Sequence, residues 1–218
     1  MHMHTRAARS AEGLLALMAL AVAAYAILAY ALQPAGIAVG EAMQQVYRLH
    51  PLLIHTHAFA AGLALLLGPG QFSTRLRARR PALHRWIGRV YLGAGIVLGG
   101  ISGLGLARVA QGGWVAQLGF ACLALAWLYT GWRGYAAIRR GERVRHRRWM
   151  LRNHALTLAA VSLRIYVAVA LALGWPFATA YAVIAWLCWV PHLVIAQWWL
   201  GRDKGVTGMG EPALGRCS

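Results

Sequence analysis

The chain has 218 residues, of which 60% are hydrophobic and only 12% are charged, whereas a soluble domain usually carries about 25% charged residues. The formal net charge is +17, but the basic residues lie in short segments between apolar runs, as they do in membrane proteins. Composition therefore excludes an ordinary soluble domain and argues against a nucleic-acid partner.

Six apolar runs are long enough to cross about 30 Å of hydrocarbon as helices. The first, at 11–32, follows a basic arm at 1–10 and is longer than the apolar core of a cleaved signal peptide. The other spans are predicted at 51–70, 89–110, 113–138, 151–173 and 177–200, followed by a tail at 201–218. We therefore predict an all-α, polytopic membrane helical bundle of six transmembrane helices over residues 11–200, with core helices at about 51–173.

The basic residues also predict the orientation of the bundle. Nineteen of the 22 Lys and Arg residues lie in the arm, in the segments 71–89 and 133–152, and in the tail. Arg48 and Arg108 lie in the opposite loops, and Arg164 lies within a span. Because Lys and Arg concentrate in cytoplasmic loops, we expect both chain ends in the cytoplasm and the protein in a bacterial inner membrane.

The third predicted span is rich in glycine, with Gly95, Gly99 and Gly103 at four-residue spacing. Small residues at this spacing let helices approach closely. The pattern predicts close packing, either within the chain or between two copies. A homodimer through this helix and the lipid bilayer are the partners that we expect.

Arg164 and His57 form the first candidate site. An ionisable side chain inside a span is a functional hypothesis by default. At 1.5 Å per residue, His57 lies roughly 9 Å and Arg164 roughly 14 Å from the outer ends of their spans. The two side chains are therefore predicted to share one outer-side pocket for an anionic ligand. The alternative is structural, with Arg164 tied to backbone carbonyls and His57 bonded between helices.

A second candidate group lies on the cytoplasmic side. His146, Met150 and His154 follow one another at four-residue spacing, so they share a face if the fifth helix begins early. His84 precedes the third span. Imidazole is a usual ligand of b-type haem and of copper, and thioether suits copper(I). His146, Met150 and His84 are the candidate metal ligands, whereas the alternative is that His84 and His146 are solvated members of basic loops.

Two helix starts resemble each other, at 83–89 and 146–152, since each reads His, Arg, Trp and a closing Arg. They predict duplicated hairpins, or they reflect a common preference for Arg and Trp at the inner interface. Of the five acids, none lies deep in a span. This absence argues against carboxylate-driven transport and against hydrolysis by paired carboxylates.

The chain resembles the domain-of-unknown-function 2306 family over about residues 50–200. The resemblance rests on the segments 57–72, 83–91, 146–152, 163–166 and 186–191. It implies a multispan membrane protein and no established activity. The family's recurring polar positions correspond to His57, His84, His146, Arg147, Arg148, Arg152 and Arg164. His154 and His192 lie outside that pattern.

A weaker resemblance is to six-helix, two-haem membrane cytochromes of the ascorbate-reducible type. The resemblance implies haem ligands on helices two to five, but the fourth span of this chain contains no histidine. At most one haem b follows the pattern, between His84 and either His146 or His154.

Three functions remain open from the sequence, and whether the protein is an enzyme is not decided. The first is a haem- or quinone-linked redox protein with ligands among His84, His146, His154, His57 and Arg164. The second is a transporter or channel for a small anion or lipid-like molecule that contacts Arg164. The third is a membrane assembly or metal-handling factor.

Overall fold

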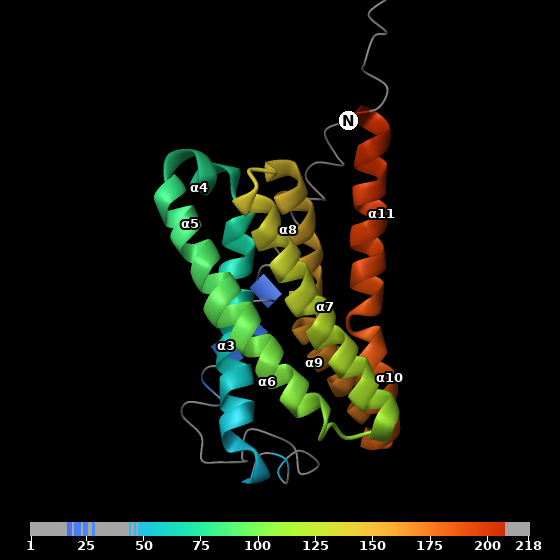
Figure 1. Cartoon of the computed structure of the whole chain (residues 1–218). Helices are drawn as coiled ribbons and strands as arrows, with labels where there is room; N and C mark the ends of the chain where they lie inside the picture. The colour runs from blue at the N-terminus through green and yellow to red at the C-terminus, as the bar shows by residue number, and fades with distance from the viewer. Residues whose placement is uncertain are drawn as a thin grey trace, which may run out of the picture.

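The computed structural model describes residues 48–207, with side chains as far as Arg202, and before them residues 17–18, 20–22, 24–25, 28, 44 and 46. The described residues are helical and contain no strand (Figure 1). The helices are α3 (Pro51–Gln71), α4 (Thr74–Arg79), α5 (Pro81–Val90), η1 (Tyr91–Val97), α6 (Leu98–Ala107), α7 (Gly113–Arg139), α8 (Arg143–Thr157), α9 (Ala159–Ala172), α10 (Phe177–Leu187) and α11 (Val190–Thr207).

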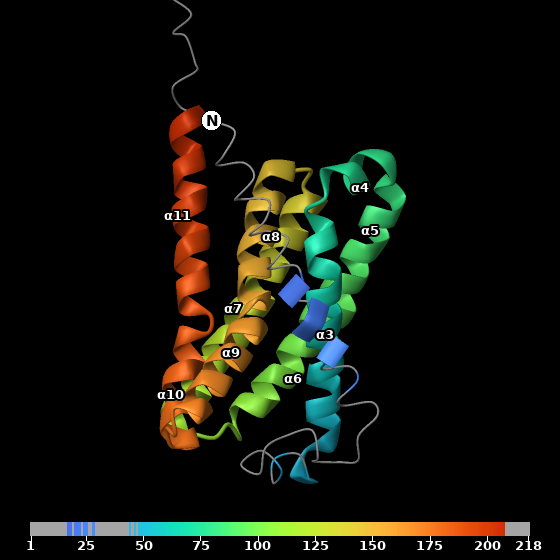
Figure 2. The same cartoon turned by 180° about the vertical axis from the view of Figure 1, so that it is seen from behind.

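Five of the described helical segments are long and apolar enough to cross a membrane. They are Pro51–Gln71, Pro81–Ala107, Gly113–Arg139, Arg143–Ala172 and Phe177–Arg202. Figures 1 and 2 show these segments side by side as an elongated bundle. The prediction of an all-α, multi-pass membrane bundle is therefore confirmed.

The predicted arm at 1–10, most of the predicted first span at 11–32 and most of the tail at 201–218 lie outside the described residues. Parts of the first span are described, and there Met18 and Val22 pack against Leu65 of α3 and Val161 of α9. Figure 2 shows these short helical pieces beside α3.

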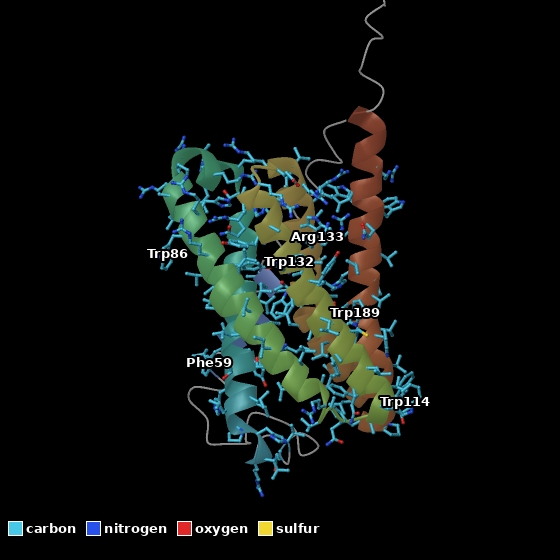
Figure 3. All side chains as sticks on the ribbon, in the orientation of Figure 1. Phe59, Trp86, Trp114, Trp132, Arg133 and Trp189 are labelled. Carbon is cyan, nitrogen blue, oxygen red and sulfur yellow. The ribbon has the colours of Figure 1, made fainter. Side chains whose placement is uncertain are left out.

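Large apolar side chains cover the outside of the bundle. Leu52 is 80% exposed, Ile101 is 60% exposed and Trp114 is 71% exposed. In Figure 3, Phe59 and Trp86 point away from the helices, and Trp114 lies at one end of α7. Soluble proteins rarely expose so much contiguous apolar surface, so this surface is suited to lipid.

The arginines gather at one end of the bundle, which we call the basic end. This end contains α4, the start of α5, the end of α7 and the start of α8 (Figure 1). The opposite end contains the start of α3 and the α6–α7 and α9–α10 connections. In the α6–α7 connection, Gly112 has a φ of 91°, and a Cβ there would lie 2.7 Å from the Ala178 carbonyl oxygen, so this turn requires glycine.

Two predicted helix starts are too late, and the last predicted span is interrupted. The third span begins at Pro81 rather than 89, and the fifth begins at Arg143 rather than 151. The sixth is interrupted at Cys188–Trp189, just before Pro191, as expected where a proline cannot continue the hydrogen-bond pattern. Hydrophobicity marks where a chain enters hydrocarbon, but a helix also continues through the charged interface. As a result, His84 and His146 lie within helices and not in loops.

A buried polar network joins η1, α7 and α8. The Tyr91 hydroxyl donates to Asn153 Oδ1 at 2.8 Å and lies 3.0 Å from Thr157 Oγ1. Asn153 Nδ2 donates to the Trp127 carbonyl at 2.8 Å and to Thr130 Oγ1 at 2.9 Å. Trp127 Nε1 donates to Thr157 Oγ1 at 2.9 Å. All five residues are buried, so these bonds fix how the three helices meet.

The glycine-rich helix packs within the chain. A Cβ at Gly95 would lie 3.1 Å from Ala64 Cβ, and one at Gly99 would lie 2.9 Å from the Trp127 ring. These contacts account for the four-residue glycine spacing without a second copy, and the homodimer stays a prediction. The π-helical segment η1 lies within this helix and places Tyr91 in the core.

We expect Asn153→Ala to lower the free energy of unfolding in mild detergent by about 2 kcal/mol. Asn153 makes three interhelical side-chain bonds, and such bonds average about 0.6 kcal/mol within membranes. The measurement is reversible unfolding followed by circular dichroism. The control is Tyr91→Phe, which removes only the hydroxyl and should cost about half as much; equal stability of Asn153→Ala and the native chain would contradict the assigned role.

Candidate functional site

A cavity of about 250 Å³ lies inside the bundle. Side chains from α3, α6, α7, α8, α9 and α10 line it, and most are small or aliphatic. The lining also includes Val46, Val109 and Ala110, which lie at the opposite end. The cavity therefore extends from the middle of the bundle to that end.

His57 and Arg164 both line this cavity, in agreement with the juxtaposition expected from their depths. They lie close enough to interact electrostatically. Among the described residues, no Asp or Glu lines the cavity. Its described wall is therefore largely apolar, and a guanidinium and an imidazole are prominent among its polar groups.

The His57 ring is held by the glycine-rich helix. Its Nδ1 lies 2.9 Å from the Gly99 carbonyl oxygen, and a Cβ at Gly103 would lie 3.1 Å from its Cε1. Because a carbonyl oxygen only accepts hydrogen bonds, Nδ1 carries the proton in this bond. The other ring nitrogen, Nε2, is then the one that can exchange a proton with a ligand.

The Arg164 guanidinium is oriented along its own helix. Its Nη1 donates to the Ala160 carbonyl at 2.8 Å, one turn earlier on α9. This backbone bond orients the guanidinium, a planar fork of N–H donors, at the wall of the cavity. Arg164 therefore has the backbone bond that the structural alternative predicts, and it also places a positive charge at the cavity wall.

Aromatic residues that were not foreseen complete the cavity. Trp127 and Thr157 belong both to the cavity lining and to the buried network, so the network forms part of the wall. Phe120 and Tyr181 lie against each other, with ring centroids 5.0 Å apart. Aromatic residues are common throughout the sequence, so only the tertiary contacts show that Phe120, Trp127 and Tyr181 line the cavity.

The second candidate group lies toward the basic end, and different contacts hold its members. His146 Nδ1 donates to the Gly134 carbonyl at 2.8 Å. Met150 is buried against Gly134, where a Cβ would lie 2.7 Å from the sulfur. His84 lies within electrostatic range of His146. Across the described residues, no three His, Cys, Asp or Glu side chains are grouped as metal ligands.

His154 occupies a tight niche beside the end of α3. Its ring lies 5.2 Å from the Phe72 ring, centroid to centroid, and a Cβ at Gly68 would lie 2.6 Å from its Nδ1. The Nδ1 atoms of His84 and His154 are buried and find no hydrogen-bond partner among the described residues. Such atoms require an explanation, and they are the strongest structural hint of a ligand at this end.

Two further histidines make structural contacts. His55 stacks on Phe59 with ring centroids 6.2 Å apart, and its Nδ1 donates to the Pro51 carbonyl at 2.8 Å. His192 donates from Nδ1 to the Ala155 carbonyl and lies 3.0 Å from Ser162 Oγ. These bonds tie α11 to α8 and α9.

A family model described as "Predicted membrane protein (DUF2306)" matches residues 54–200. The chain therefore belongs to this family, as the sequence motifs indicated. Comparison with curated proteins and with solved structures gives no match. The family assignment supports a membrane protein and gives no activity.

We expect Gly68→Ala to displace the His154 ring and to destabilise the chain by roughly 1–3 kcal/mol, the usual effect of overpacking. Gly70→Ala is the matched control, because nothing lies within 4 Å of a Cβ there. Thermal unfolding of the two variants in the same detergent makes the comparison. Equal melting temperatures would contradict the close packing of Gly68 against His154.

Proposed function

We propose that this member of the family binds a small amphiphilic anion in the cavity lined by His57 and Arg164, and that it moves or presents this molecule within the membrane. The carrying observation is that the Arg164 guanidinium and the His57 imidazole line a cavity whose other described lining residues are mostly small, aliphatic or aromatic. In surroundings of low dielectric constant, a guanidinium attracts an anion strongly.

The size of the cavity narrows the ligand class. Pockets for drug-sized ligands measure about 300–1,000 Å³, and this cavity measures about 250 Å³. A short aliphatic or aromatic body with one anionic head group suits it. Arg164 binds the head group, and Phe120, Trp127 and Tyr181 contact the body. When the ligand enters as a neutral acid, His57 Nε2 can accept its proton, and it can return that proton when the ligand leaves.

The orientation that goes with this function follows from charge. The basic end carries nearly all described arginines, and such segments face the cytoplasm. The cavity then extends to the outer side of a bacterial inner membrane, and the ligand enters from there. The same charge distribution assigns both chain ends to the cytoplasm. This assignment requires six spans, of which the first is the predicted span at 11–32.

We expect Arg164→Gln to weaken binding of octanoate about tenfold to a hundredfold, because a hydrogen bond to a charged group contributes about 1.5–3 kcal/mol. Isothermal titration of the chain in lipid nanodiscs measures this affinity. Octanol, which has the same chain without the charge, should bind weakly to both proteins.

Arg108→Gln is the matched control, since Arg108 is exposed near the same end and does not line the cavity. It should leave octanoate binding unchanged. Equal losses in the two variants would refute the assignment of Arg164. Preferential binding of duroquinone, a neutral quinone, would contradict the anion and favour the quinone-linked redox function.

A second candidate function, redox chemistry on a b-type haem, is supported by the buried unpartnered Nδ1 atoms of His84 and His154. These imidazoles come from separate helices, α5 and α8, and they are the residues that would hold the haem. A haem held by them would supply one-electron chemistry. Gly68 and Phe72 of α3 lie against His154, so the end of α3 would have to move, which places this candidate second.

The haem candidate predicts a sharp Soret band and reduced α and β bands in protein purified from haem-supplemented cells. His84→Ala and His154→Ala should each abolish these bands, because each removes an axial ligand. His55→Ala should retain them. A featureless dithionite-reduced spectrum of the native chain would exclude the candidate.

A further inference from the structure

A second pocket, separate from the central cavity, lies between α8 and α11 at the basic end. It measures about 260 Å³. The residues that line it include Arg145, Arg148, Trp149, Arg152, Gln197 and Leu200. Three of the described lining residues are arginines, so this part of the chain brings a strong positive charge to the pocket.

The three arginines converge because of their spacing. Residues three and four apart share one face of a helix, and positions 145, 148 and 152 of α8 therefore face α11. Figure 1 shows α11 standing beside the upper part of α8. The pocket is thus formed by one helix that carries the charge and a second helix that closes the site.

Contacts to α11 hold two of the guanidinium groups in place. Arg148 Nη2 donates to the Leu200 carbonyl at 2.8 Å. Arg152 donates from Nε and Nη2 to Gln197 Oε1, at 3.1 and 2.9 Å. Each guanidinium has five donors in a rigid fork, so these bonds orient the groups and leave donors for a ligand.

The charges in the pocket call for an anion. Arg145 forms an ion pair with Glu142 at 3.1 Å, and the Arg145 side chain is half exposed. Arg148 and Arg152 lie within electrostatic range of each other. Like charges that are partly buried repel each other, and a phosphate oxyanion between them offsets this repulsion.

Trp149 stabilises the arrangement and indicates its depth. The Arg152 guanidinium carbon lies 4.7 Å from the Trp149 ring centroid, and that of Arg133 lies 4.8 Å from it. On α11, Arg202 stacks on Trp198 at 4.4 Å. Arginine and tryptophan together mark the interfacial layer of a membrane, where lipid phosphates lie.

We propose that the α8–α11 pocket binds the phosphate group of an anionic phospholipid through Arg148 and Arg152. Forked guanidinium groups bind phosphate oxygens in pairs, and basic pockets between membrane helices hold anionic head groups. The pocket lies at the basic end, the end at which Arg and Trp residues mark the interfacial layer. This site is independent of the ligand proposed for the central cavity.

The experiment compares two double variants of equal charge in the full-length protein. Arg148→Gln/Arg152→Gln removes the pocket arginines, whereas Arg143→Gln/Arg147→Gln removes two exposed arginines of the same helix that do not line the pocket. Native mass spectrometry measures bound dioleoyl-phosphatidylglycerol, with dioleoyl-phosphatidylcholine and inorganic phosphate as separate probes.

We expect phosphatidylglycerol to bind the native chain and the Arg143/Arg147 variant, and to bind the Arg148/Arg152 variant at least about tenfold more weakly. Inorganic phosphate that binds with the same dependence on the variants, and competes with the lipid, would assign the pocket to soluble phosphate. Equal lipid binding by both double variants would overturn the proposal.

If the Arg148→Gln/Arg152→Gln variant fails to fold, two further measurements still test the proposal. The variant Arg148→Lys/Arg152→Lys keeps both charges but loses the forked donors, and it should bind phosphatidylglycerol with intermediate affinity. In the native chain alone, binding of phosphatidylglycerol no tighter than that of phosphatidylcholine would also refute the site.

Discussion

The constraint on which the structure depends is that polar groups inside a membrane bundle must find partners within the protein. Asn153 meets this constraint for three helices at once, through Tyr91, Trp127 and Thr130. Since α8 is fixed in this way against α7 and η1, α9 begins at a defined place. The position of Arg164, and with it the character of the cavity, follows from that placement.

The network also lies between two groups of candidate site residues along the bundle. On one side is the apolar cavity with His57 and Arg164, and on the other are the histidines of the basic end. Trp127 and Thr157 belong to the network and to the cavity wall. A ligand in the cavity therefore touches groups whose bonds hold α7 and α8 together, so binding and bundle stability share the same side chains.

Much of this arrangement could be predicted from the sequence, and the exceptions have physical causes. The core spans follow from apolar run length, and the shared pocket of His57 and Arg164 follows from the regular rise of a helix. Asn153 could not be recognised, because a single amide beside an arginine-rich segment looks solvated until its helix is known to begin earlier. Arg148 and Arg152 were known only as family positions, since their pocket depends on α11, a helix far away in the sequence.

The interruption of the last span at Cys188–Trp189 has a mechanical consequence. The part before it, α10, packs against α7 and α9, whereas α11 packs against α8. A helix without a continuous backbone bond pattern bends more easily at that point. Membrane helices adjust their tilt to bilayer thickness, and α11 is tied to α8 through Arg148 and Arg152, so a change in its tilt acts on α8 and on the joint at Cys188. Because Cys188 also lines the cavity, this joint links the cavity wall to the thickness of the surrounding lipid.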